Sequence, residues 1–89
     1  MEDTQTAIDK LAALASPLEW LREHDYKGVA MDPCHCPVAK YLKAKTGDDH
    51  TVTPIAILNM KTKQFYGVPL NVAEVIHDVD TGQAPELTL

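Results

Sequence analysis

The stretch TVTPIAILNMKTKQFYGV, residues 51–68, decides the fold class, because it interrupts a chain that otherwise has helical patterns. Its first part, Thr51–Leu58, is rich in β-branched residues and predicts a strand. The polar segment Asn59–Gln64 predicts a hairpin loop, and Phe65–Val68 predicts the returning strand. Pro54 has no N–H to donate to a ladder, so it favours an edge strand or a bulge at that point.

Two helices are predicted near the N-terminus from their start signals. The residues Thr6–Asp9 fit a capping box and open a first helix that is expected to end near Ala15. Ser16–Glu19 is a stronger start signal, because Ser16 can cap and Pro17 suits the first helical position. The second helix is expected to run from Pro17 to about His24.

Two more helices flank the predicted hairpin. One begins at Pro37 and runs to about Thr46, with Gly47 as its stop signal. The other begins near Asn71, a good capping residue, and is closed by Gly82. Its apolar stripe follows the i, i+3, i+4, i+7 spacing of a helix and consists of Val72, Val75, Ile76 and Val79.

These elements predict an α+β fold with three N-terminal helices, a small antiparallel β-hairpin and a C-terminal helix. A two-stranded hairpin is marginal by itself, so a third short strand is expected to join it, and Val29–Met31 is the best candidate. The chain forms a single small domain, residues 1–89. Its ends, residues 1–5 and 84–89, are expected to be loosely ordered.

Composition and charge exclude several classes of protein. The net charge is −5 and the hydrophobic fraction 45%, which is ordinary for a folded acidic domain. The sequence has no basic stripe, so no nucleic-acid partner is expected. It has neither an apolar run long enough for a membrane helix nor a signal peptide, so a cytoplasmic protein with reduced cysteines is expected.

The motif Cys34-His35-Cys36, bracketed by Pro33 and Pro37, is the main candidate for chemistry. We interpret it as a helix-entry loop in which Cys36 takes the N-cap position. The alternative is a small metal-binding or thiol-redox protein that uses Cys34, His35 and Cys36. A structural zinc site usually has four ligands in two spaced pairs, and here the second pair is missing and the first is separated by one residue. A helix N-terminus does stabilise a thiolate, but the usual redox motif has two residues between its cysteines. No catalytic residue, metal or cofactor is therefore predicted.

The remaining candidate surface is aromatic. Trp20, Phe65 and Tyr66, with Met60, are large side chains expected at a helix or hairpin edge, and such residues are enriched in interfaces. The competing interpretation places Trp20 and Phe65 in the core. An exposed strand edge would offer a second docking surface or a route to a homo-oligomer. The predicted function is therefore a non-enzymatic protein-interaction module with an unidentified protein partner.

Three segments also carry a resemblance: SPLEWLREHDYKG (residues 16–28), CPVAKYL (residues 36–42) and DTGQAPEL (residues 80–87). Together with the strand pair and the valine-rich helix, they resemble small uncharacterised proteins of actinobacteria and their phages. The matching residues are Cys36, Ala39, Tyr41, Leu42, Gly82, Pro85, Glu86 and Leu87. The resemblance spans about Leu18 to Leu87. It implies no particular activity, and is compatible with a phage or mobile-element accessory protein that modulates a host protein.

Overall fold

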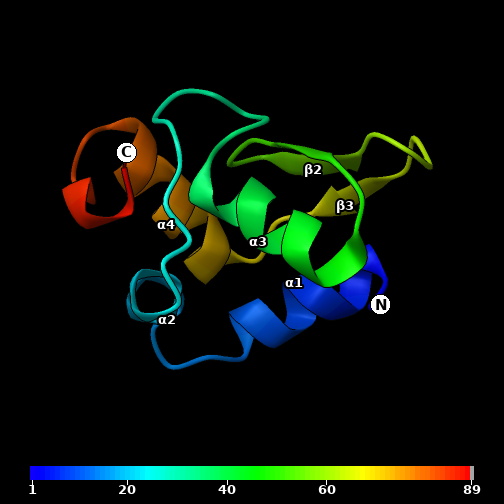
Figure 1. The fold of residues 1–89 in the computed structure, drawn as a ribbon, viewed down its shortest axis with the longest axis horizontal. Coiled ribbons are helices and arrows are strands. Elements are labelled where there is room, and N and C mark those ends of the chain that lie inside the picture. Colours follow the sequence, from blue (N-terminus) through cyan, green and yellow to red (C-terminus); the bar gives the residue numbers. More distant parts are fainter. Residues whose placement is uncertain (89) are drawn as a thin grey trace.

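The computed structural model describes residues 1–88 and has an α+β fold, which confirms the predicted class. The elements are α1 (Thr4–Ala12), α2 (Pro17–Glu23), α3 (Pro37–Thr46), β1 (His50–Val52), β2 (Ala56–Asn59), β3 (Phe65–Gly67), α4 (Leu70–Asp80) and a 3-10 turn, η1 (Pro85–Leu87). The strands β2 and β3 lie at one end of the molecule, and α2, α4 and the C-terminal turn lie at the other (Figure 1). No helix within residues 1–88 is long and apolar enough to cross a membrane.

The sheet has three antiparallel strands in the order β1-β2-β3. The prediction of one strand over Thr51–Leu58 is wrong, because the chain turns back at Pro54 and forms two strands. Thr53 closes this turn: its hydroxyl accepts hydrogen bonds from the backbone N–H groups of Ile55 (3.3 Å) and Ala56 (3.1 Å). The third strand therefore comes from within the predicted hairpin.

The segment Val29–Met31 is not a strand. Val29 donates its N–H to the His35 carbonyl (2.9 Å), which folds residues 29–36 into a loop. Met31 has a left-handed backbone conformation, with φ of 61°. The loop meets the sheet where the Val52 N–H donates to the Pro33 carbonyl (2.9 Å). This contact holds the Cys34-His35-Cys36 motif beside β1.

The start signals of α2 and α3 are confirmed, with Ser16 and Cys36 as their N-caps. The cap of α1 is Asp3 rather than Thr6, because the Asp3 carboxylate accepts from the Thr6 N–H (2.8 Å). This hydrogen bond lowers the pKa of Asp3. Asn71 does not cap α4; its amide donates instead to the Ala12 carbonyl (2.7 Å) and ties the start of α4 to the end of α1.

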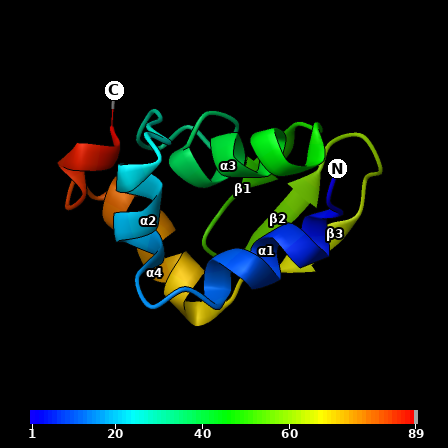
Figure 2. The same ribbon diagram turned by 60° about the horizontal axis from the view of Figure 1, so that its bottom comes forward.

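The core lies between the helices and one face of the sheet. Residues on this inner face, Val52 and Ile57 among them, are buried. The helix α3 packs against α1 and β1 (Figure 2), and the buried Tyr41 of α3 donates its hydroxyl to the Ala7 carbonyl of α1 (2.6 Å). Burial raises the pKa of Tyr41 to about 12, so this hydroxyl stays protonated at physiological pH.

The opposite face of the sheet carries the alternate residues of each strand. We call it the outer sheet face, and it consists of Thr51, Ala56, Leu58, Phe65 and Gly67. Each of these residues is half-buried or exposed. The strand register places Thr51, Leu58 and Phe65 in one row across the three strands. A single face of the sheet is therefore packed on the helices.

A buried polar network joins the N-terminus of α1 to the sheet. His50 is 2% exposed, its Nδ1 lies 2.9 Å from the Asp48 carbonyl, and its Nε2 lies 2.9 Å from the Thr4 hydroxyl. The amide of Asn59 donates to the same hydroxyl (3.0 Å) and to the Asp48 carboxylate (3.1 Å). A carbonyl can only accept, so Nδ1 carries a proton, and in the neutral ring Nε2 accepts from the Thr4 hydroxyl. The network therefore fits a neutral His50.

The two chain ends make specific contacts. Thr4 is buried within α1, and at the other end Ala84 and Leu87 are buried. Thr88 forms a bridge with Gly28. The expected loose order of residues 1–5 and 84–89 concerns motion and stays a prediction, and residue 89 lies outside the described residues.

His50 predicts a specific pH dependence of stability. Burial lowers its pKa in the folded state below the ordinary value of about 6.5. Below that pH the unfolded chain binds more protons, so the free energy of unfolding should fall by at most about 1.4 kcal/mol per pH unit. Denaturant titrations between pH 7.5 and 5 measure this fall, and the His50→Gln variant should lack most of it. A pH-independent wild type over this range would contradict the assignment.

Candidate functional site

Cys36 has a structural position. It is 3% exposed, and its Sγ accepts the Ala39 N–H at 3.4 Å, which confirms it as the N-cap of α3. Burial raises the pKa of its thiol to about 11, although the backbone N–H groups of Val38 and Ala39 act in the opposite direction. Desolvation therefore outweighs the effect of the helix terminus, which argues against a thiolate at Cys36 and so against the thiol-redox alternative at this residue.

The environment of Cys34 differs from that of Cys36. It is exposed, and its Sγ lies 3.7 Å from the Thr51 hydroxyl on the outer sheet face. Its N–H donates to the Asp32 carboxylate (3.1 Å). Both cysteines are free thiols. Among residues 1–88, no group of three or more His, Cys, Asp or Glu side chains is placed to hold a metal ion.

His35 belongs with Cys34 rather than with Cys36. Its Nδ1 lies 3.0 Å from the carboxylate of Asp32, and both side chains reach solvent. The hydrogen bond from His35 lowers the pKa of Asp32 below its ordinary value. Asp32 was not among the residues predicted for the site. The signal for it is its position three residues before His35 in a loop that Pro33 and Pro37 stiffen.

A groove beside this loop follows α3 and the end of the hairpin. Three hollows share Asp49, so they lie side by side, and we call them together the Asp49 groove. The first hollow has a volume of about 280 Å³. It lies between the loop that carries Cys34 and His35 and the part of α3 that carries Lys40 and Lys43. The next, of about 320 Å³, is lined by Cys34, His35, Asp49, His50 and Met60. The groove thus connects the motif to the loop between β2 and β3.

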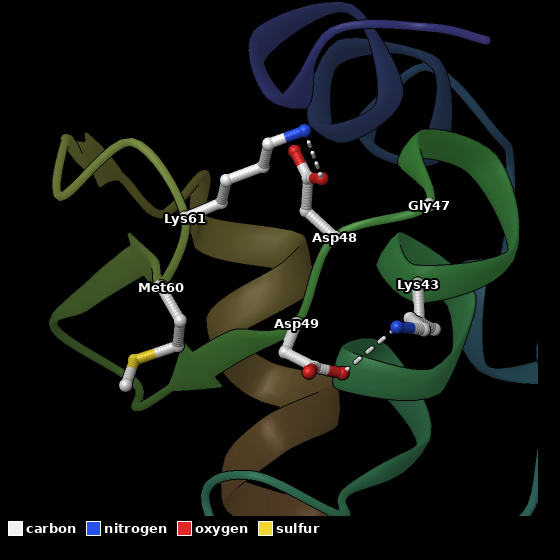
Figure 3. A pocket seen from close by; sticks show the side chains of 6 residues that line it. All are labelled: Lys43, Gly47, Asp48, Asp49, Met60 and Lys61. Atoms are coloured by element: carbon white, nitrogen blue, oxygen red, sulfur yellow. Dashed lines mark ion pairs between the residues drawn. The ribbon is translucent and has the colours of Figure 1, made fainter.

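Figure 3 shows the third hollow, about 320 Å³, which is lined by Lys43, Gly47, Asp48, Asp49, Met60 and Lys61. Lys43 pairs with Asp49 (3.2 Å), and Lys61 reaches Asp48 at 4.0 Å. Met60 donates its N–H to the Asp49 carbonyl (2.9 Å), which extends the pairing of β1 and β2 by one step. The charges in this hollow are therefore paired, and Met60 supplies its sulfur.

The predicted aromatic residues are not brought together. Trp20 of α2 is half-buried, stacks on His24 with ring centres 3.9 Å apart, and meets Tyr41 edge-on at 5.5 Å. Phe65 lies on β3, towards the opposite end of the molecule (Figure 1), and is 71% exposed. Tyr66 is half-buried against the core, and its hydroxyl donates to Gln64 (3.0 Å). Trp20 thus belongs to the helical end, whereas Phe65 projects from the sheet.

The strand β3 has an open edge. It pairs with β2 on one side, and within residues 1–88 no further strand pairs with its other side. The β1 edge differs, because the Pro33 carbonyl accepts from Val52 there (2.9 Å). The open edge and the exposed Phe65 therefore lie on the same strand.

Comparison of the chain with protein-family models, with curated proteins and with solved structures finds no match.

The two thiols are expected to differ strongly in reactivity. Because a thiolate is the reacting species and the pKa of Cys36 is about 11, iodoacetamide at pH 7 should label Cys34 and leave Cys36 unmodified in the folded protein. In denaturant, both cysteines should react. Peptide mass spectrometry after a timed reaction measures the two sites separately. Equal labelling rates in the folded protein would show that Cys36 is accessible.

Proposed function

We propose that this protein is a non-enzymatic interaction module that binds a protein partner through the outer sheet face. The observation that carries the proposal is Phe65, which projects 71% exposed from an edge strand and lies in one row with Leu58 and Thr51. Apolar residues that gather on one exposed face are typical of interaction sites, and large apolar residues form the centres of interfaces.

The surroundings of Phe65 indicate what kind of partner would fit. The exposed loop between β2 and β3 leads directly into Phe65 and contains Lys63, so positive charge precedes the apolar centre. An apolar segment flanked by acidic residues complements this surface. The open edge of β3 adds unpaired backbone groups, which an extended partner segment would use as hydrogen-bond partners.

The contacts of Cys36, Asp49 and His50 support a role without catalysis. Cys36 serves as a helix cap and carries a neutral thiol at physiological pH. In the Asp49 groove, the Asp49 carboxylate is paired with Lys43, and the imidazole nitrogens of His50 both have partners inside the protein. These side chains are therefore committed to structure rather than free to act as acid, base or nucleophile.

Affinity capture with matched variants tests the proposal. Immobilised wild type, Phe65→Asp and Leu70→Asp are incubated with a lysate of the source organism, and bound proteins are quantified by mass spectrometry. Leu70, at the start of α4, is 78% exposed and controls for added charge at an apolar surface position. A specific partner should bind wild type and Leu70→Asp but lose more than tenfold on Phe65→Asp, since central interface residues contribute at least about 2 kcal/mol.

Two outcomes would overturn the proposal. A partner retained equally by all three proteins would place the binding surface elsewhere. Size-exclusion chromatography that gives a dimer for wild type and a monomer for Phe65→Asp would show that a second copy of the chain occupies the outer sheet face, in place of a different protein.

A further inference from the structure

Two sulfur atoms from distant parts of the chain converge on one hydroxyl. The Thr51 hydroxyl donates to Met60 Sδ at 3.1 Å, and Cys34 Sγ lies 3.7 Å from the same oxygen. The Met60 thioether can only accept, so while the Thr51 hydroxyl donates to it, the Cys34 thiol is left to donate to Thr51. Both sulfur-bearing side chains line the same hollow of about 320 Å³. The thiol of Cys34 and the thioether of Met60 therefore line one hollow.

We propose that Cys34, Met60 and His35 form a surface site for one Cu(I) ion. Thiolate and thioether sulfur are soft ligands that favour Cu(I) over harder cations. The ion would replace the thiol proton of Cys34, which passes to solvent, and would take the place of the Thr51 hydroxyl between the two sulfurs. No electron is transferred in this step. Thiolate and Cu(I) together are neutral, so the site gains no net charge.

His35 is the third ligand of the proposed site. It lines the same hollow, and its Nδ1 is held by the Asp32 carboxylate at 3.0 Å. Metal-binding histidines commonly have one ring nitrogen fixed by a carboxylate in this way, which leaves the other nitrogen for the metal. Asp32 also accepts from the Cys34 N–H (3.1 Å), so one carboxylate orients both residues. His50, in contrast, has both nitrogens occupied by Asp48 and Thr4.

This site differs from the one considered in the sequence. In the metal-binding alternative drawn from the sequence, the second sulfur ligand was Cys36, and no metal was predicted for the motif. Cys36 is a buried helix cap with a pKa of about 11. Met60, which lines the same hollow as Cys34, supplies the second sulfur instead. The copper site adjoins the outer sheet face at Thr51, but the inference does not require that a partner binds there. Its ligands come from the loop and from the residue that follows β2.

Anaerobic titration with Cu(I) against a coloured Cu(I) chelator tests the site. Wild type should take up one Cu(I) per chain, and Cys34→Ser should lose this uptake. Removing a group that only orients a metal ligand costs about 10–100-fold in affinity, so Met60→Leu should weaken binding by at least that much. Met31→Leu is the matched control, because Met31 is exposed in the same loop that carries Cys34. It should bind Cu(I) as the wild type does.

Two results would overturn the inference. Full affinity in Met60→Leu would mean that the Cys34 thiol binds alone. Alternatively, one Cu(I) per two chains would indicate a thiolate bridge between molecules. Copper X-ray absorption on the wild-type complex gives a second readout, in which two sulfur neighbours are expected and one would contradict the proposal. Circular dichroism of each variant confirms that it is folded.

Discussion

Replacing Ile76 with alanine is expected to lower the free energy of unfolding by about 2–5 kcal/mol. Ile76 is 2% exposed and belongs to the core where α4 packs against α1 and α2. The substitution removes three carbon atoms from a site that backbone elements on several sides hold in place. A domain of this size has only about 5–15 kcal/mol of stability in total, so the loss is a large share.

A denaturant titration followed by circular dichroism measures the effect, with Leu70→Ala as its control on the same helix. Leu70 is 78% exposed, so its truncation should change the free energy of unfolding by less than about 0.5 kcal/mol. A loss below that value for Ile76→Ala would mean that this face of α4 is not in the core.

Replacing Gly28 with alanine is expected to cost about 3 kcal/mol, the upper end of the usual range for an overfilled site. A Cβ at this position would lie 2.2 Å from the His35 carbonyl oxygen and 2.6 Å from the carbonyl carbon of Cys36. These are backbone atoms, so no side-chain rotation can relieve the overlap. Gly28 also donates its N–H to the Leu87 carbonyl (2.8 Å), which couples the loop of Cys34 to the C-terminal turn.

Gly67→Ala provides the matched control, because a Cβ there meets nothing within 4 Å. Its effect on the free energy of unfolding should stay within about 0.5 kcal/mol. In Gly28→Ala, the displaced loop should also expose Cys36 to iodoacetamide. A Gly28→Ala protein as stable as wild type would show that residues 29–36 do not pack on Gly28 as described.

Local signals in the sequence were sufficient for α2 and α3. Proline at the first helical position and a capping residue before it act within a few residues, so neither helix depends on distant contacts for its boundaries. The split at Pro54 was harder to predict. The run from Thr51 to Leu58 has uniform strand composition, and the turn depends on the Thr53 hydroxyl bonding two backbone N–H groups.

The caps of α1 and α4 were mispredicted for a related reason. Thr6 and Asn71 are both suitable capping residues, but Asp3 lies earlier and offers a charged acceptor to the first turn of α1. The amide of Asn71 is drawn to the free Ala12 carbonyl at the end of another helix. Capping propensity is local, whereas this second partner is fixed only when α1 and α4 pack together.

The candidate site was predictable only in part. The motif drew attention to Cys34 and His35, and both line the Asp49 groove. Met60 lies far along the chain and meets Thr51, the neighbour of Cys34, only because β1 and β2 pair in this register. The burial of Cys36 likewise follows from the packing of α3. Pairings of this kind depend on tertiary structure, and spacing in the sequence carries no signal for them.

The central claim, that the outer sheet face binds a protein partner, is tested most directly by photo-crosslinking in cells. A benzophenone-bearing phenylalanine analogue is placed at Phe65 in one protein and at Leu70 in another. Both side chains are exposed, but only Phe65 lies on the outer sheet face. The account predicts a discrete cross-linked protein from position 65 and none from position 70. No cross-link from position 65, or the same product from both positions, would contradict it.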